Sequence, residues 1–216
     1  LSLLISAWVT LGLLGYVLAS RAYSYRGIRL KRYPWLGFLT VFLFQGAYLY
    51  LVIRLALEPS LQTLPIWEWP HTLWLSALGG AYLLGGAYPL TQIYQHEADR
   101  RSGDRTLSLL LGYRGTFHFC GIMFLLGIGL LGAYYAETHA LYKLVILLVF
   151  TQPTLGYFLG WYLRIRREVS AANFEATMRM NLIAAMGTSL AFGTMVLLQQ
   201  TAWGQEFLEG LPAFLT

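Results

Sequence analysis

The sequence predicts an all-α, polytopic membrane protein, and three observations predict it. Of the 216 residues, 57% are hydrophobic and only 12% are charged, which is too apolar for an ordinary soluble domain. The apolar residues form six runs of about 20 residues, the length with which an α-helix crosses a bilayer. The connections between the runs alternate between basic and non-basic, as repeated crossing would require. We therefore expect a single transmembrane helix bundle over residues 1–216, embedded in a lipid bilayer and without a nucleic-acid partner.

Each predicted span is bounded by charged residues or by clusters of Pro and Gly. The six spans cover about Leu1 to Ala19, Trp35 to Leu57, Thr72 to Ile93, Tyr113 to Ala136, Leu141 to Ile165 and Ala176 to Gln200. Small residues recur within them, as in Gly79-Gly80-Ala81, and allow neighbouring helices to pack closely. The single cysteine, Cys120, lies in an apolar run, so the sequence indicates neither a disulfide framework nor a metal–thiolate site.

The positive charges fall on one side of this predicted topology. Thirteen of the fifteen Lys and Arg residues lie in or beside the first, third and fifth connections, the exceptions being Arg54 and Lys143. The segment after the last span carries only Glu206 and Glu209. By the positive-inside rule the basic side is cytoplasmic. We expect the protein in the inner (plasma) membrane of the cell, with these connections facing the cytoplasm.

The stretch Tyr88 to Gly112, YPLTQIYQHEADRRSGDRTLSLLLG, is an island of charge between two apolar runs. If the helix that enters at Tyr88 continues through it, several polar side chains follow one another at spacings of three and four and share one face. These side chains are Gln92, either Gln95 or His96, and Asp99. Glu97 then lies on the opposite face.

This polar stripe ends in the carboxylate of Asp99 and is followed by Ser102-Gly103, which interrupts the helix. Mg²⁺ takes hard oxygen ligands from one or two carboxylates and completes its shell with water and substrate phosphate. The pattern therefore favours a divalent cation site. The alternative is a solvated loop in which Glu97 and Arg101 form an ordinary i, i+4 ion pair.

The first connection, Tyr23 to Gly37, reads YSYRGIRLKRYPWLG and alternates tyrosine with positive charge. Arg offers phosphate a fork of donors and Lys a point charge, and the face of a tyrosine ring stabilises a nearby carbocation. The alternative is a topology determinant that touches anionic lipid. Together, acids for Mg²⁺, bases for phosphate and an apolar bundle indicate a substrate with a diphosphate head and a hydrocarbon tail.

In these two stretches the chain resembles the UbiA superfamily of intramembrane prenyltransferases, all-α proteins with nine transmembrane helices around a central cavity. Its members have a second aspartate-rich motif, D-x-x-x-D, followed by Gly, a basic residue, Thr and a Leu/Gly ending. Here the matching positions are Gln95 to Asp99, Gly103, Arg105, Thr106, Leu107 and Leu111-Gly112. The family also has a Tyr-rich basic loop two helices earlier, and Lys31 stands at its lysine position. The resemblance covers nearly the whole chain as the last six helices of the family.

Two positions depart from the family pattern. Gln95 stands where the first aspartate of the second motif usually is, and it offers a neutral oxygen instead. The first aspartate-rich motif of the family, N-D-x-x-D-x-x-x-D, is absent. The chain begins Leu1-Ser2-Leu3 without an initiator Met, so we expect an N-terminally truncated chain that lacks three helices and this motif, and that is inactive alone.

The resemblance implies Mg²⁺-dependent transfer of a prenyl group from an isoprenyl diphosphate to a small acceptor inside the membrane. An aromatic ring destined for quinone biosynthesis is the default acceptor. Asp99 and Lys31 are the implied catalytic residues. The implied metal ligands are Asp99, Glu97 and Asp104; the implied diphosphate-binding residues are Arg29, Lys31, Arg105 and Tyr25; and Gln92, Gln95 and His96 would orient substrate or water. His96 also has a simpler interpretation as a helix-end residue.

Two other functions stay open at this point. A transporter or structural membrane protein would be favoured by carboxylates within the spans, but the acids cluster at a membrane face. A non-catalytic isoprenoid-binding protein would be favoured by the loss of Asp99, which is present. The sequence leaves open the acceptor, which in the family is an aromatic, porphyrin-type or glycerol phosphate compound, and also the prenyl chain length and the oligomeric state.

Overall fold

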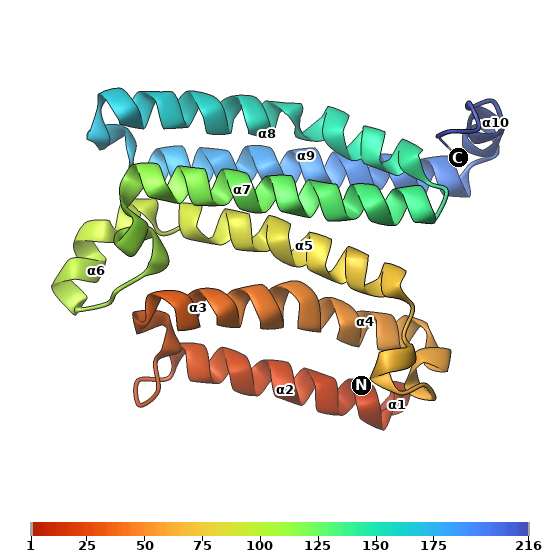
Figure 1. Cartoon of the computed structure of the whole chain (residues 1–216), viewed down its shortest axis with the longest axis horizontal. Coiled ribbons are helices and arrows are strands. Elements are labelled where there is room, and N and C mark those ends of the chain that lie inside the picture. The colour runs from red at the N-terminus through yellow and green to blue at the C-terminus, as the bar shows by residue number, and fades with distance from the viewer. Residues whose placement is uncertain (1, 216) are drawn as a thin grey trace. The chain divides into compact units, whose positions relative to one another are not determined.

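A computed structural model describes residues 2–215 of the chain, and over these residues the structure is helical without a β-strand (Figure 1). The predicted all-α fold is confirmed. The chain divides into two compact units, Leu1–Leu130 and Leu131–Thr216, which are described here one at a time. A single domain over the whole chain stays a prediction.

The first unit contains most of the helices. Its elements are α1 (Ser2–Ile5), α2 (Ala7–Ser24), the 3-10 helix η1 (Leu30–Arg32), α3 (Pro34–Thr40), the π-helix η2 (Val41–Tyr48), α4 (Leu49–Leu57), η3 (Pro59–Gln62), η4 (Ile66–Glu68), α5 (His71–Leu90), η5 (Ile93–Gln95), α6 (His96–Ser102) and most of α7 (Leu107–Glu137). Elements α3, η2 and α4 follow one another without a break and form one apolar helical stretch. Its first residue, Pro34, suits a helix start because the missing N–H would have no helical partner there.

The core of the first unit joins α3, α5 and α7. Phe38, Leu107 and Met123 form a buried cluster, against which Phe42 and Tyr88 pack among others. Close helix contact is allowed by small residues, as the sequence predicts. A Cβ on Gly46 of η2 would lie only 2.6 Å from Cα of Ala81 in α5.

The continuous helix assumed for the stretch after Tyr88 does not form. Helix α5 ends at Leu90, directly after Pro89, which has no N–H to donate to the preceding turn. A turn and the short helix η5 then lead into α6, which ends before Gly103. Helix α7 is itself interrupted at Gly112, whose backbone (φ 68°, ψ 174°) is non-helical and is reached almost only by glycine.

The second unit contains the end of α7, α8 (Leu141–Arg167), the 3-10 helix η6 (Val169–Ala171), α9 (Phe174–Gln200) and α10 (Ala202–Glu209). Helices α8 and α9 run side by side as a hairpin (Figure 1). Asn173 caps the start of α9, since its Oδ1 accepts a hydrogen bond of 2.9 Å from the Ala176 N–H. The Trp161 indole donates to the Ala171 carbonyl at 2.8 Å and ties the connecting turn to α8.

Four helical stretches are long and apolar enough to cross a membrane. They are Pro34–Leu57, Leu107–Glu137, Leu141–Arg167 and Phe174–Gln200. They correspond to four of the six predicted spans. The other two predicted spans are helices α2 and α5, but these do not meet the same measure of length and mean hydropathy, so the number six stays a prediction.

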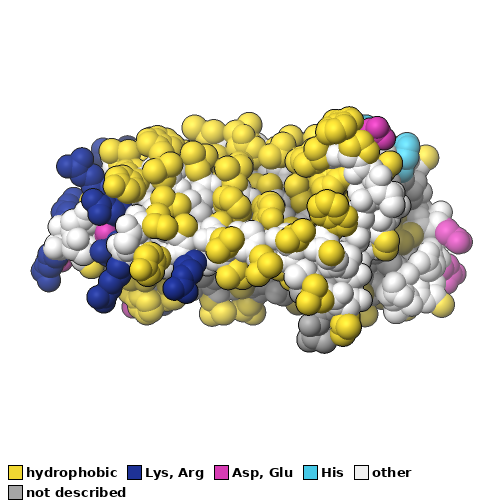
Figure 2. Space-filling view, turned by 90° about the horizontal axis from the view of Figure 1, so that it is seen from below, with side chains coloured by type: hydrophobic (Ala, Val, Ile, Leu, Met, Phe, Trp, Pro, Cys, Tyr) yellow, Lys and Arg dark blue, Asp and Glu magenta, His cyan; other side chains and the backbone are white. Residues whose placement is uncertain are grey.

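The outward surface of the helices is apolar. On α2, for example, Leu11, Leu14 and Leu18 are exposed. In Figure 2 hydrophobic side chains cover the middle of the visible face, while Lys and Arg gather at one end of it. Such a surface suits contact with lipid, because the polar backbone groups are bonded within the helices and the side chains that face outward are apolar.

The hairpin of α8 and α9 gives a first testable prediction. A Cβ on Gly187 would lie 2.6 Å from the Phe150 carbonyl oxygen, whereas nothing lies within 4 Å of a Cβ on Gly193 in the same helix. We expect Gly187→Ala to force the helices apart and to lower the free energy of unfolding by about 1–3 kcal/mol. Thermal unfolding of the protein in detergent measures this. Gly193→Ala is the control and should not lower the midpoint, and equal midpoints for both variants would contradict the packing described.

Candidate functional site

The end of helix α6 brings two carboxylates together. Gly103 has a left-handed backbone (φ 72°), and its N–H donates to the Arg100 carbonyl at 3.3 Å. The Asp104 N–H donates to the Asp99 carbonyl at 3.0 Å. These two bonds form a Schellman motif, the usual way of ending a helix at glycine. The turn therefore folds Asp104 back beside the helix that carries Asp99.

The Asp99 carboxylate is buried, with the residue only 8% exposed. Its Oδ2 accepts a hydrogen bond of 2.9 Å from the Thr106 hydroxyl. Burial raises the pKa of Asp99 above its usual value, the Thr106 hydrogen bond opposes this rise, the charge of Asp104 adds to it and the charge of Lys31 opposes it. A positive ion placed beside Asp99 and Asp104 would therefore stabilise their ionised forms.

The Asp104 carboxylate is held from the first basic loop. Arg29 donates from Nη2 to Oδ2 of Asp104 at 2.8 Å, and the Ser102 hydroxyl donates to the same oxygen at 3.3 Å. A main-chain bond reinforces this contact, because the Arg105 N–H donates to the Arg32 carbonyl at 3.1 Å. The basic loop and the acidic turn, 75 residues apart at Arg29 and Asp104, are thus joined through both side chain and backbone.

Two further cations lie at this end of the first unit without a salt bridge. Within residues 2–215, neither Lys31 nor Arg105 makes a side-chain hydrogen bond or ion pair. Lys31 is half-buried, and its charge acts on Asp99. Arg105 is exposed. Their ammonium and guanidinium groups are available to an anion.

A pair of tyrosines lies at the membrane-facing side of the carboxylates. The hydroxyls of Tyr23 in α2 and Tyr88 in α5 are 2.7 Å apart and share a hydrogen bond. Tyr88 also bonds the side chain of Gln92. Burial raises the pKa of Tyr23, and the charges of Asp99 and Asp104 act in the same direction, so this phenol keeps its proton.

His96 belongs to a buried polar network that spans the break in α7. Its Nε2 lies 2.8 Å from the Ser108 hydroxyl, which is 3.0 Å from the Thr116 hydroxyl. Thr116 donates to the Gly112 carbonyl at 2.8 Å, and the Ser108 N–H donates to Oε1 of Gln92 at 3.2 Å. The network therefore fixes the start of α7 against α6 and against the end of α5.

The protonation state of this network follows from its geometry. A threonine has one hydroxyl proton, and Thr116 gives it to the Gly112 carbonyl, so the proton between Ser108 and Thr116 comes from Ser108. Ser108 then accepts from His96, which carries its proton on Nε2. Burial, with the charge of Arg100, lowers the pKa of His96 to about 4, so the imidazole is neutral at physiological pH.

The structure brings some of the predicted site residues together and leaves others apart. Asp99, Asp104, Arg29, Lys31 and Gln92 gather at one end of the first unit. Glu97 does not join them: its side chain is 77% exposed and pairs with Arg101, as in the alternative interpretation of the motif. Tyr25 is exposed beneath the Arg21 guanidinium, and the Gln95 amide donates to the Thr91 carbonyl of its own turn at 3.1 Å.

Several residues of the site were not assigned a role from the sequence. These are Tyr23, Tyr88, Ser102, Thr106, Ser108 and Thr116. Thr106 lies within the recognised motif, and a hydroxyl so close to two carboxylates was the available signal. The tyrosine pair and the bond across Gly112 join residues that have no helical spacing, so no sequence pattern identifies them.

The donor set at this site suits a hard divalent cation. Among the described residues, no group of three or more His, Cys, Asp and Glu side chains is arranged to hold a metal. Asp99 and Asp104 are nevertheless adjacent and buried, and each engages only its Oδ2 in the hydrogen bonds described above. Two carboxylates are enough for Mg²⁺ when water and substrate phosphate supply the remaining ligands.

Comparison with known proteins identifies one relationship. The model of the UbiA prenyltransferase family matches residues 1–183. No curated protein and no solved structure matches the chain. The matched stretch contains every residue of the site, from Tyr23 to Thr116, and covers most of the 216 residues.

The His96 network predicts a pH dependence of stability. The pKa of His96 is about 4 in the folded protein and about 6.5 when unfolded. Between these values the unfolded chain binds more protons, so the contribution of His96 to stability is fully present above about pH 6.5 and is lost as the pH falls towards 4. Unfolding midpoints measured across this window should fall more steeply for the parent than for His96→Gln. His71→Gln, a change at an exposed histidine, is the control, and parallel curves for parent and His96→Gln would contradict the prediction.

Proposed function

The chain belongs to the UbiA prenyltransferase family, and we propose that it transfers a prenyl group from an isoprenyl diphosphate to an aromatic quinone precursor. Membership of the family and the apolar helices make it an integral membrane protein. The observation that carries the proposal is the buried pair Asp99 and Asp104 with Lys31 and Arg29 beside it. A site of this kind suits a diphosphate and a divalent cation together.

In the proposed site, Asp99 and Asp104 hold Mg²⁺, which when bound neutralises charge that develops on the leaving diphosphate. We leave Glu97 out of this ligand set because its carboxylate pairs with Arg101 in an exposed position. Gln95 also stays outside it, since its amide bonds the preceding turn. The Thr106 hydroxyl orients the Asp99 carboxylate by donating to one of its oxygens.

Lys31, Arg105 and Arg29 are the proposed diphosphate-binding residues. Lys31 and Arg105 have no salt-bridge partner among residues 2–215, so binding an anion breaks no existing ion pair. Arg29 uses Nη2 on Asp104 and keeps further N–H donors for phosphate. The main-chain bond between Arg105 and Arg32 keeps these cations beside the acidic turn as the substrate binds.

The proposed reaction begins when the allylic C–O bond of the substrate breaks and its electron pair leaves with the diphosphate. The ring carbon of the acceptor then forms a bond to the allylic carbon and loses a proton. The faces of Tyr23 and Tyr88 stabilise the positive charge that develops on the allyl group. Their neutral hydroxyls bond each other, which keeps both rings oriented.

We propose that the basic end of the first unit faces the cytoplasm and that the membrane is the inner (plasma) membrane. The first and third connections meet there through Arg29 and Asp104, and both are rich in Lys and Arg. Basic connections are retained on the cytoplasmic side during insertion. An isoprenyl diphosphate made in the cytoplasm would then meet the site with its tail in the bilayer.

The proposal predicts unequal effects for two acidic residues. The full protein in lipid nanodiscs is given geranyl, farnesyl and geranylgeranyl diphosphate with a panel of aromatic acceptors and Mg²⁺, and released diphosphate is measured. We expect Asp99→Asn to lower kcat/KM by about 100-fold or more, because it removes a ligand that acts on the leaving group. Glu97→Gln is the matched control and should retain activity, since it changes an exposed ion pair.

Each outcome of this assay has a distinct meaning. Acceptor-dependent release that is lost in Asp99→Asn alone supports the transferase. Saturable diphosphate binding by the parent without turnover would contradict it in favour of a non-catalytic isoprenoid-binding protein. Equal losses in both variants would contradict the ligand set, because Glu97 would then act as the sequence alone predicts.

A further inference from the structure

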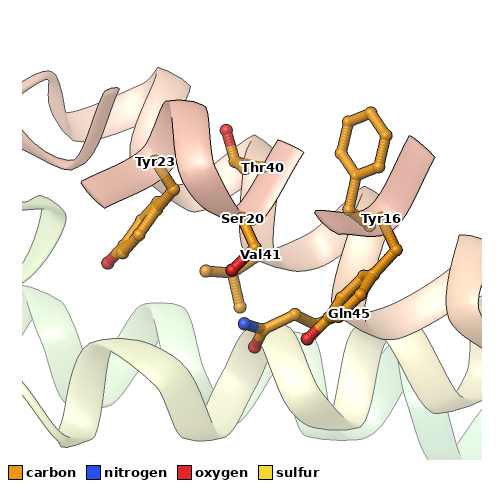
Figure 3. Close-up of a pocket in the computed structure, with 7 residues that line it drawn as sticks. Tyr16, Ser20, Tyr23, Thr40, Val41 and Gln45 are labelled. Carbon is orange, nitrogen blue, oxygen red and sulfur yellow. The ribbon is translucent and has the colours of Figure 1, made fainter. Parts of the chain in front are cut away.

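A second polar pocket lies on the other side of Tyr23, between α2 and the start of the π-helix η2 (Figure 3). It contains about 230 Å³ of space, part of which is open to the outside. Its lining includes Tyr16, Ser20, Tyr23, Thr40, Phe44 and Gln45. The proposed reaction, as described so far, uses only Tyr23 of this set.

The residues of the pocket are brought together by two helical geometries. Tyr16, Ser20 and Tyr23 follow at spacings of four and three and share one face of α2. Thr40 and Gln45 are five apart and would diverge by about 140° on an α-helix. In η2 the hydrogen bonds span five residues, as the bond from the Leu49 N–H to the Phe44 carbonyl shows at its end, and this pairing returns Gln45 to the side of Thr40.

The polar groups of the pocket have unused hydrogen-bonding capacity. Within residues 2–215, the side chains of Tyr16, Ser20 and Gln45 make no hydrogen bond. Thr40 gives its proton to the Leu36 carbonyl at 2.7 Å and keeps its oxygen as an acceptor. In Figure 3 the Ser20 hydroxyl, the Gln45 amide and the Tyr16 hydroxyl lie around the same space.

An unpaired amide at the depth of Gln45 calls for a partner. The residue lies about 16 Å along the apolar stretch that starts at Pro34, close to the middle of a bilayer about 30 Å thick. An amide without a hydrogen bond is costly there, because hydrocarbon offers none. Gln152 in α8 shows the alternative, since its amide donates to the Leu148 carbonyl of its own helix at 3.2 Å. Gln45 instead lines the pocket.

The chemistry of the lining selects the ligand. No Lys, Arg, Asp or Glu lines the pocket, so it offers no counter-ion to a charged group. Hydroxyls and an amide supply both donors and acceptors, which match a hydroxyl or a carbonyl. The rings of Tyr16 and Phe44 supply flat apolar surface for an aromatic ring.

We propose that this pocket binds the hydroxyl- or carbonyl-bearing edge of a neutral aromatic acceptor, with Gln45 as its main hydrogen-bonding residue. The assignment of an acceptor rests on the proposed transferase function. Tyr23 connects the two sites, since its side chain lines the pocket while its hydroxyl bonds Tyr88 beside the carboxylates. An acceptor seated here lies next to the reacting end of the prenyl diphosphate. A carboxylate-bearing ring edge would be excluded, because it would find no positive charge.

Photolabelling tests the pocket without turnover. The full protein in lipid nanodiscs is irradiated with para-hydroxybenzophenone, at a pH where the phenol is protonated, or with benzophenone-4-carboxylate, and the labelled residues are mapped by mass spectrometry. We expect the phenol to label the segments that form the pocket, around Tyr16 to Tyr23 and Thr40 to Gln45, and the carboxylate to leave them unlabelled. Labelling spread evenly over the spans, or equal labelling of the pocket by both probes, would overturn the proposal.

Substitutions test the role of Gln45. Gln45→Leu should lower pocket labelling by the phenol about five- to tenfold, the effect of one lost hydrogen bond. Gln152→Leu makes the same chemical change in another helix and should leave labelling unchanged. Tyr16→Phe and Ser20→Ala remove single hydroxyls with little change of shape and give smaller losses. Labelling that persists in Gln45→Leu at the parent level would overturn the role of this residue.

Kinetics separates this proposal from the transferase function. For the parent, Gln45→Leu should raise KM for a neutral phenolic acceptor by about five- to tenfold and leave KM for the prenyl diphosphate unchanged. Turnover with an unchanged acceptor KM and no pocket labelling would overturn the pocket and keep the transferase. Pocket labelling without any acceptor-dependent diphosphate release would support a neutral aromatic site and contradict the transferase.

Discussion

Two like charges held side by side in an apolar protein are the constraint on which the site depends. Asp99 and Asp104 are both buried, and each raises the cost of ionising its neighbour. The local structure answers this repulsion with Arg29 on one carboxylate and Thr106 on the other. The first basic loop is therefore more than a topology signal, because it supplies the charge that lets the acidic turn fold where it does.

The fold was largely predictable, because its signal is written in the composition. Apolar runs of spanning length gave the all-α class, and four of them are helices of the expected extent, as in Leu141–Arg167. Helix α2 was harder, since Ser6 caps it and separates it from α1 within the predicted first run. The breaks at Pro89 and Gly112 have local causes, but no sequence rule says whether such a residue kinks a helix or ends it.

The site was predictable where one residue type marks it and unpredictable where contacts are long-range. Asp99 and Lys31 stand at motif positions, and the charge of Lys31 does act on Asp99. The alternative for Glu97, an exposed pair with Arg101, could not be separated from metal binding by spacing alone, since both use the same i, i+4 geometry. The bond of Tyr23 to Tyr88 joins residues 65 positions apart and depends on how α2 and α5 pack.

The π-helix at Val41–Tyr48 has a consequence for the register of the whole first unit. Each of its turns holds one residue more than an α-turn, so removing a single residue there would convert the segment to α-helix and rotate everything before it by about 100°. Phe38 would leave the core and the first basic loop would lose its alignment with Asp104. Relatives that keep this site should therefore keep the length of this helix, whatever side chains they place along it.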